Sequence, residues 1–267
     1  MSPVPQPLPS RDVLRQACTE IADQAAREIM RIYAGDLGVR DKADRSPVTD
    51  ADHAAEAIIL AGLNALTPGI PIVAEEEMAA GRVPVLDSGP FWLVDPLDGT
   101  KEFIKRNGEF TVNIALVENG RPTIGVVLAP ATDTLWRGVV GLGADKRQPD
   151  GSFAAIHTRP LPAGGLTACA SRSHAVYSDL DIWFRNNDLT VAERVQAGSS
   201  LKFCLIAEGK ADIYPRFGPT SEWDTAAGHA VLEAAGGEVV TTDGTPLAYG
   251  KPGFKNPHFI ARSKAAW

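Results

Sequence analysis

The sequence contains few cysteines and no long apolar run. Its three cysteines, Cys18, Cys169 and Cys204, are too scattered for a disulfide framework or a clustered zinc site, which leaves free thiols in a reducing compartment. A helix that spans a bilayer needs about 20 apolar residues in succession, and the chain offers no such run. A basic stretch followed by an apolar one is also missing from the N-terminus, so no cleaved signal is expected. These absences predict a cytoplasmic protein without a transmembrane segment.

Basic residues are outnumbered as well. There are 26 Lys and Arg against 33 Asp and Glu, which gives a formal net charge of −7. Nonspecific binding to nucleic acid requires a basic face, so nucleic acid is not an expected partner. A phosphorylated small molecule remains compatible with this charge, because bound divalent cations can reverse the local charge of a site.

The first part of the chain is predicted to consist of a tail and an α+β lobe. Residues 1–10 are proline-rich and are expected to form an extended tail. Residues 11–150 are expected to pack helices on an antiparallel sheet. The strongest hairpin signal is the pair Asn119-Gly120 between two apolar runs. The predicted helices cover 13–32 and about 51–66, and the predicted strands cover 70–74, 91–94, 110–117, 123–128 and 135–140.

The second part, residues 151–267, alternates strands and helices, which predicts an α/β lobe. A segment rich in Gly, Pro and charge, residues 141–165, is the expected border between the lobes. The fold class is therefore predicted as α/β, with an α+β half followed by an α/β half. The predicted strands cover 166–170, 190–195, 212–217 and 238–242, and the predicted helices cover 201–208 and 225–235.

Acidic side chains fall where predicted strands end. Glu75 follows one short apolar strand, Asp95 follows another, and Asp98 lies in the same turn. A residue at a strand end lies at the edge of its sheet, where loops build sites on a rigid scaffold. Asp52 and Asp224 lie near the starts of predicted helices. These carboxylates are candidates for one polar site if the fold brings them together.

The segment 95–100, with the sequence DPLDGT, has the properties of a metal-binding turn. Pro96 favours an extended conformation at Asp95, which fixes the direction of that carboxylate. Gly99 permits a positive φ, which would expose backbone amides beside the carboxylates. Hard cations such as Mg²⁺ take carboxylate, carbonyl and water oxygens as ligands. The segment offers two carboxylates and the intervening carbonyl of Leu97.

Each of these signals also has a purely structural interpretation. The Asp98-Gly99 pair is common in turns, and residues 49–52 could form a capping box at a helix start. Asp224 could cap the helix that follows it. The three consecutive glutamates 75–77 could be a solvent-exposed charge run. The metal-site interpretation depends on all of these residues meeting in the folded chain.

Four motifs resemble, in order and spacing, the inositol monophosphatase superfamily over nearly the whole chain after the tail. They are SPVTDAD (46–52), AEE (74–76), VDPLDGT (94–100) and WDTAAG (223–228). The resemblance implies a layered αβαβα sandwich, in agreement with the two predicted halves. The stretches 100–115, 199–203 and 221–224 are similar to the bacterial 3′(2′),5′-bisphosphate nucleotidase branch. That similarity implies Mg²⁺-dependent removal of the 3′(2′)-phosphate of adenosine 3′(2′),5′-bisphosphate to give AMP and phosphate.

The resemblance also implies a metal site. Glu75, Asp95, Asp98 and Asp224 would hold two or more Mg²⁺ ions through their carboxylates, and Leu97 would contribute its carbonyl. Metal ions suit the task because phosphate monoesters require acceleration of up to ~10²¹-fold. They lower the pKa of a bound water and neutralise the phosphoryl and leaving oxygens. Direct in-line attack by a metal-activated water, without a covalent enzyme intermediate, is therefore predicted.

Roles at the substrate follow from the same resemblance. Thr100 and Glu75 would orient the attacking water with the help of Asp52, and the backbone amides of Gly99 and Thr100 would hold phosphate oxygens. His174, Lys202 and Arg216 would contact the remainder of the substrate, although Arg172 could replace His174, which could also be a surface histidine. The implied catalytic residues are Asp52, Glu75 and Thr100, and the implied substrate contacts are Glu75, Leu97, Asp98, Gly99, Thr100, His174, Lys202, Arg216 and Asp224.

Several alternatives remain open at this point. A haloacid-dehalogenase-type phosphatase needs one residue between its two aspartates, whereas Pro96 and Leu97 both intervene here. An inositol monophosphatase or a sugar bisphosphatase fits the same superfamily. A non-enzymatic nucleotide or metal sensor would require the loss of a catalytic position, yet Asp52, Thr100 and Asp224 are present. A homodimer and a peripheral position on the cytoplasmic face of the inner membrane also stay open.

Overall fold

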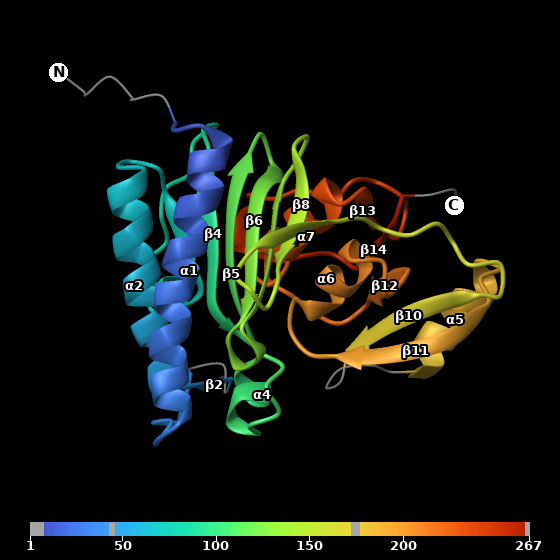
Figure 1. Cartoon of the computed structure of the whole chain (residues 1–267), viewed down its shortest axis with the longest axis horizontal. Helices are drawn as coiled ribbons and strands as arrows, with labels where there is room; N and C mark the ends of the chain where they lie inside the picture. Colours follow the sequence, from blue (N-terminus) through green and yellow to red (C-terminus); the bar gives the residue numbers. More distant parts are fainter. Residues whose placement is uncertain (1–7, 43–45, 172–176, 265–267) are drawn as a thin grey trace.

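Two β-sheets and three layers of helices alternate through the molecule. The structure is a computed structural model that describes residues 8–42, 46–171 and 177–264. In Figure 1, α1 and α2 cover the outer face of the first sheet, α6 and α7 lie between the sheets, and α5 lies beyond the second. This order of layers confirms the predicted αβαβα sandwich. The helices are α1 (Arg11–Tyr33), α2 (Asp50–Leu66), α3 (Glu75–Ala79), α4 (Thr100–Ile104), α5 (Tyr177–Asn186), α6 (Leu201–Ala207) and α7 (Ala226–Ala234).

The first sheet has seven strands in the order β3-β4-β5-β6-β7-β8-β9, and only β3 and β4 pair in parallel. The hairpin between β5 and β6 was predicted, and Asn119 and Gly120 at its turn have positive φ angles of 51° and 71°. Two successive residues with positive φ fit a type I′ turn, whose twist matches that of the two strands in a tight hairpin. The strands are β3 (Ile72–Ala74), β4 (Phe91–Asp98), β5 (Thr111–Glu118), β6 (Arg121–Ala129), β7 (Thr134–Val139), β8 (Gly143–Arg147) and β9 (Phe153–Ile156).

The last two strands of this sheet lie inside the segment 141–165, the predicted border between the lobes. The predicted lobe boundary after residue 150 falls in the turn between β8 and β9, and β9 pairs with β8. β8 carries charged, half-exposed residues, and β9 is apolar but only four residues long, so neither has the long apolar run of a central strand. β4 and β5, by contrast, are buried along nearly their whole length because helices cover both faces of the sheet.

The second sheet has five strands in the order β11-β10-β12-β14-β13. β10 is parallel to both β11 and β12, whereas β14 is antiparallel to its two neighbours. Four of these strands were predicted, but β14 and α5 were not. The strands are β10 (Leu166–Ser171), β11 (Val191–Ala197), β12 (Ile213–Arg216), β13 (Gly237–Thr241) and β14 (Phe259–Ser263), and a separate two-stranded sheet joins β1 (Arg40–Asp41) to β2 (Pro47–Val48).

Two glycines let α7 lie directly on the first sheet. A Cβ at Gly125 on β6 would come 2.3 Å from the carbonyl oxygen of Ala227, and one at Gly138 on β7 would come 2.8 Å from the Cα of Val231. Neither contact is possible for a larger residue without displacement of the helix. This close packing holds the start of α7, and Asp224 just before it, against the sheet that carries Asp95 and Asp98.

Within the described ranges, no helix combines the length and the apolar character that crossing a bilayer requires.

Candidate metal and substrate site

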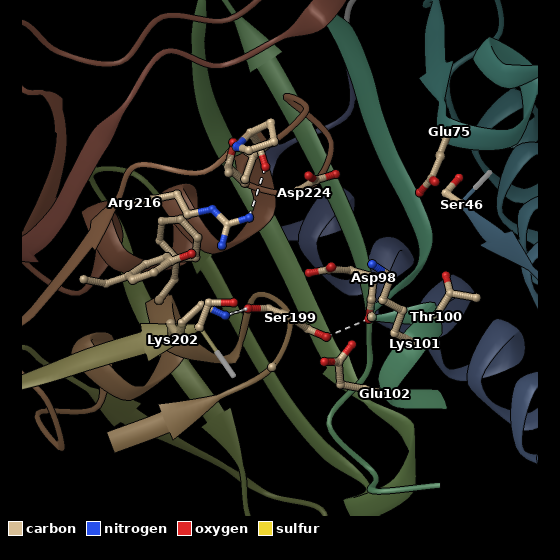
Figure 2. A pocket seen from close by; sticks show the side chains of 18 of the residues that line it. Ser46, Glu75, Asp98, Thr100, Lys101, Glu102, Ser199, Lys202, Arg216 and Asp224 are labelled. Atoms are coloured by element: carbon tan, nitrogen blue, oxygen red, sulfur yellow. Dashed lines mark hydrogen bonds between the residues drawn. The ribbon is translucent and has the colours of Figure 1, made fainter. Parts of the chain in front are cut away.

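A pocket of about 250 Å³ lies where the loops of the two sheets meet. Figure 2 shows Glu75, Asp98 and Thr100 from the first half of the chain, facing Lys202 and Arg216 from the second half. The pocket is lined by Ser46, Pro47, Glu75, Asp98, Gly99, Thr100, Lys101, Glu102, Ser171, Gly198, Ser199, Lys202, Phe203, Tyr214, Arg216, Pro219, Thr220, Asp224 and Thr225.

The DPLDGT segment forms the end of β4, a turn and the start of α4. Asp95 opposes Asn113 on β5 and Asp98 opposes Thr111, with a register shift between the two pairs. The Asp95 carboxylate accepts a hydrogen bond of 3.0 Å from the backbone amide of Leu97, inside the segment itself. Both Asp95 and Leu97 are 1% exposed and lie behind the pocket wall. The segment is thus a rigid turn, and that rigidity sets the direction of its carboxylates.

Gly99 has the positive φ that the sequence predicted, with a value of 96°. A Cβ at this position would also come 2.4 Å from the hydroxyl of Ser199. Ser199 Oγ lies 2.7 Å from the backbone oxygen of Asp98 and 2.7 Å from that of Glu109. Gly99 is therefore needed both for its backbone angle and for the close approach of the 198–200 turn. Sequence reasoning placed residues 199–203 in a motif but did not identify this contact.

Asp52 has the capping-box geometry and also a contact with the site. One oxygen of its carboxylate accepts hydrogen bonds from the backbone amide of Thr49 at 2.7 Å and from the Thr49 hydroxyl at 2.6 Å. The other oxygen accepts a hydrogen bond of 3.2 Å from the hydroxyl of Thr100. Burial raises the pKa of Asp52 to about 6, although the bonds from Thr49 oppose the shift. Asp52 thus caps the start of α2 and at the same time contacts Thr100.

The acidic residues near the pocket repel one another in a poorly hydrated region. Burial raises the pKa of Asp95 well above its ordinary value, and repulsion from Glu75, Asp98 and Asp224 adds to the shift. Burial raises the pKa of Asp224 to about 8, again with repulsion from Asp98 and Glu75. The pKa of Asp98 rises to about 6 through burial, against the attraction of Lys202. Asp98 and Asp224 keep some surface open to the pocket, yet lost hydration still dominates both shifts.

Glu75 lies at the start of α3 and is paired with Lys42, a residue that sequence reasoning did not single out. Lys42 Nζ lies 2.6 Å from Glu75 Oε1 and 2.6 Å from Glu76 Oε1. Burial opposes the charge of Lys42, but the two glutamates raise its pKa overall. Glu76 is only 4% exposed, so the charge-run interpretation of 75–77 is wrong for that residue. Glu77 fits it, since it pairs with Arg82 at the surface.

Within the described parts of the chain, no three Asp, Glu, His or Cys side chains converge tightly enough to enclose one ion. The predicted ligands therefore share one acidic region without forming a closed cage of carboxylates. Mg²⁺ sites are commonly of this open kind, because the ion keeps several waters and takes further oxygens from substrate phosphate. The donor set fits such an ion, since all four predicted side-chain ligands are carboxylates. Glu75 is paired with Lys42, whereas burial raises the pKa of all three aspartates.

Asp224 does not cap α7. The N-cap of that helix is Thr225, and no side-chain bond caps it. Asp224 Oδ2 instead accepts a hydrogen bond of 2.9 Å from the backbone amide of Ser221. The loop is further fixed by Glu222, whose fully buried carboxylate accepts bonds from the amides of Gly250 at 2.7 Å and Lys251 at 2.9 Å. The capping interpretation of Asp224 is therefore wrong, and its carboxylate faces the pocket.

The opposite wall carries the positive charge of the site. Lys202 is 4% exposed, and its ammonium donates to the carbonyls of Ala197 at 3.0 Å and Ser199 at 2.5 Å. Burial lowers its pKa to about 8, although attraction to Asp98 opposes the shift. Arg216, at the end of β12, donates to the carbonyl of Pro219 at 3.0 Å. The predicted residue His174 and its alternative Arg172 lie outside the described residues.

Comparisons with known proteins agree with this geometry. The inositol monophosphatase family model matches residues 10–265. The chain is 46% identical over 250 residues to the 3′(2′),5′-bisphosphate nucleotidase CysQ of Escherichia coli strain K12, which covers 92% of this chain and 98% of that protein. It is 45% identical over 241 residues to the protein of the same name from Buchnera aphidicola, with 90% and 88% covered.

Solved structures lead to the same family. CysQ from Bacteroides thetaiotaomicron, described as a bacterial member of the inositol monophosphatase family, superposes with a TM-score of 0.79 at 40% identity and covers 95% of this chain and 98% of that one. An inositol monophosphatase from Anabaena gives a TM-score of 0.74 at 27% identity, with 94% and 90% covered. The chain belongs to the inositol monophosphatase family.

Proposed function

We propose that the chain is a Mg²⁺-dependent 3′(2′),5′-bisphosphate nucleotidase, which hydrolyses adenosine 3′(2′),5′-bisphosphate to AMP and phosphate. The observation that carries the proposal is a single pocket with an acidic wall and a basic wall facing each other. The names of the bacterial relatives, at 45–46% identity over at least 90% of the chain, support this substrate over an inositol or sugar phosphate.

The acidic wall would hold the metal. Members of this family are metal-dependent phosphatases, and we assign two or more Mg²⁺ ions to the carboxylates of Glu75, Asp95, Asp98 and Asp224 and the carbonyl of Leu97. When bound, the ions would neutralise phosphoryl oxygens, make a water more acidic and stabilise the leaving oxygen. Their charge would also relieve the repulsion that raises the pKa of these aspartates.

Thr100 and Asp52 would orient the attacking water. The Thr100 hydroxyl donates a hydrogen bond to Asp52. Its lone pairs can therefore accept a hydrogen bond from a water in the pocket. Asp52 in turn cannot rotate, since Thr49 holds its second oxygen through two hydrogen bonds. A water held in this way keeps a lone pair directed at phosphorus. Glu75 borders the same space and would complete the orientation of that water.

The basic wall would recognise the phosphate that is not hydrolysed. Lys202 and Arg216 lie across the pocket from Thr100 (Figure 2), so a substrate with one phosphate at the acidic wall would direct a second toward them. The Gly99 and Thr100 amides would hold oxygens of the phosphate that reacts. A substrate with two phosphates fits this division better than a monophosphate does, because the charge of the basic wall would otherwise remain uncompensated.

A phosphate-release panel tests the proposal. With Mg²⁺ present, we expect adenosine 3′,5′-bisphosphate to be hydrolysed with the highest kcat/KM among the bisphosphate, inositol 1-phosphate and fructose 1,6-bisphosphate. The product should be AMP, which chromatography separates from adenosine 3′-phosphate. A preference for inositol 1-phosphate or fructose 1,6-bisphosphate would overturn the nucleotidase assignment and leave the metal site in place. Trapping a phospho-aspartate at Asp95 would overturn the attack by water.

A further inference from the structure

The hydroxyl of Ser200 lies at the point where three segments of the site meet. Ser200 is the N-cap residue of α6 and is 1% exposed. Its Oγ lies 3.0 Å from Asn113 Nδ2 on β5 and 3.2 Å from Asp98 Oδ2 after β4. It also lies 2.8 Å from the backbone oxygen of Asp224 in the loop before α7. One buried hydroxyl therefore contacts both of the pocket-facing aspartates assigned to the metal.

The donors and acceptors around this hydroxyl fix its orientation. The Asp98 carboxylate and the Asp224 carbonyl can only accept hydrogen bonds, whereas a hydroxyl has one proton and two lone pairs. The single proton of Ser200 must therefore point toward these two oxygens. Its lone pairs then face Asn113, which is consistent with the amide nitrogen donating to it. The register of the β4–β5 pair fixes the position of Asn113 opposite Asp95.

Ser199 next to it makes a different kind of contact. Among the residues that the structure describes, the hydroxyl of Ser199 contacts backbone oxygens only, those of Asp98 and Glu109. Ser200 reaches the carboxylate of Asp98 itself, and at the same time the backbone of the residue that provides another carboxylate. The two serines thus hold different parts of the site, and Ser200 alone of the two acts on a ligand side chain.

We propose that Ser200, held by Asn113, is a positioning residue that holds the Asp98 carboxylate and the Asp224 loop in the relative positions that metal binding requires. The proposal rests on the metal site of the proposed function, and it concerns residues outside the predicted ligand set. Partners that orient metal ligands typically change metal affinity by about 10- to 100-fold when they are removed. Loss of the hydroxyl should therefore weaken metal binding, and the basic wall of the pocket should be unaffected.

Metal binding by Ser200→Ala provides the test, without substrate and without a turnover readout. Titration with Mn²⁺, followed by electron paramagnetic resonance and by calorimetry, should give a Kd about tenfold higher than that of the unmodified protein. Ser263→Ala is the matched control, because Ser263 is also fully buried and its hydroxyl donates to a backbone carbonyl, that of Arg159, at 3.0 Å. This control should bind Mn²⁺ as the unmodified protein does, and Ser200→Thr, which keeps a hydroxyl, should restore most of the affinity.

Asn113→Ala extends the test to the second partner. If Asn113 acts through Ser200, the double variant should bind Mn²⁺ no more weakly than Ser200→Ala alone, a non-additive result that a double-mutant cycle detects. An unchanged Kd for Ser200→Ala would overturn the proposal, as would an equal loss in Ser263→Ala. Strictly additive losses at Ser200 and Asn113 would remove Asn113 from it. Failure of the nucleotidase assignment would look different, since the unmodified protein would then bind Mn²⁺ but release no phosphate from the bisphosphate.

Discussion

The two walls of the pocket differ in charge, in origin and in the contacts that hold their side chains. The acidic wall comes mainly from residues 52–100, where a capping box and a tight turn hold the carboxylates in place. The basic wall comes from residues after 198, and its two cations are held through backbone carbonyls. The comparison suggests a division of labour, in which the acidic wall governs turnover and the basic wall governs the affinity for substrate. Asp224 is the exception, as an acidic residue that the second half supplies.

The largest effect is expected at Asp98. Asp98→Asn keeps the size of the side chain but removes a metal-binding charge, so kcat should fall on the order of 10³-fold. Stability without metal should rise at pH 7, because burial holds the pKa of Asp98 at about 6 and the charged form is unfavourable in the folded protein. Phosphate release and thermal unfolding measure the two effects.

The pH dependence of that stability gain has a definite sign. A carboxyl group whose pKa is raised in the folded state costs stability above that pKa and costs nothing once it is protonated in both states. The advantage of Asp98→Asn in the free energy of unfolding should therefore be present above about pH 6 and vanish below its ordinary pKa near 3.8. Turnover that stays near that of the unmodified protein would contradict the assignment of Asp98 to the metal, and a loss of stability at pH 7 would contradict the pKa argument.

A smaller loss is expected at Thr100. Thr100→Ala removes the hydroxyl that bonds to Asp52, so kcat should fall by about 10²-fold while KM changes little. Thr100→Ser keeps the hydroxyl and should recover most of the rate. Steady-state kinetics on the bisphosphate distinguishes the two variants. A rise in KM with an unchanged kcat would show that Thr100 contributes to substrate binding and not to turnover.

Arg216 tests the basic wall. Arg216→Ala should raise KM for adenosine 3′,5′-bisphosphate by about tenfold, the usual scale for one charge-assisted hydrogen bond, while kcat stays within a factor of about two. Adenosine 3′-phosphate, which lacks the second phosphate, is the matched substrate and should show no change in KM. An equal loss with both nucleotides would mean that Arg216 does not recognise the second phosphate.

The smallest effect on catalysis is expected in the hydrophobic core, at a residue that does not line the pocket. Ile59 on α2 is fully buried in the core, so Ile59→Ala should lower the free energy of unfolding by about 2–5 kcal/mol. Because Ile59 does not line the pocket, kcat and KM of the folded fraction should remain near those of the unmodified protein. Denaturant unfolding and kinetics at low temperature measure both quantities. A selective loss of turnover would show that the packing of α2 determines the position of Asp52.

Sequence patterns predicted the parts of the site that depend on local geometry. The turn at 95–100, the positive φ of Gly99 and the capping box at Asp52 are all set by residues close together in the chain. The two halves followed from apolar periodicity, whereas the layered αβαβα sandwich followed from the family resemblance. Strand β14 was missed because it is only five residues long and its apolar run ends at Arg262. Helix α5 was missed although Leu180, Trp183 and Phe184 recur at helical spacing and pack on one cluster.

Contacts between distant segments could not be predicted in the same way. Lys42 meets Glu75 across 33 positions, and Ser200 meets Asn113 across 87. No spacing rule connects such pairs, because the tertiary packing of separate elements decides them. Glu222 was overlooked for a related reason, since a glutamate beside a predicted ligand gives no sign that it bonds to a loop 28 residues away.

The register shift in β4 has a consequence for the spacing of the two aspartates. Side chains alternate between the faces of a strand, so residues three positions apart normally point to opposite faces. Three steps from Asp95 to Asp98 match only two steps from Asn113 to Thr111 on the neighbouring strand, and the one surplus residue corrects the parity. Two aspartates with one residue between them would share a face without any bulge. By this alternation, deleting Leu97 would keep the two aspartates on one face, and it would remove the bulge together with the Leu97 carbonyl.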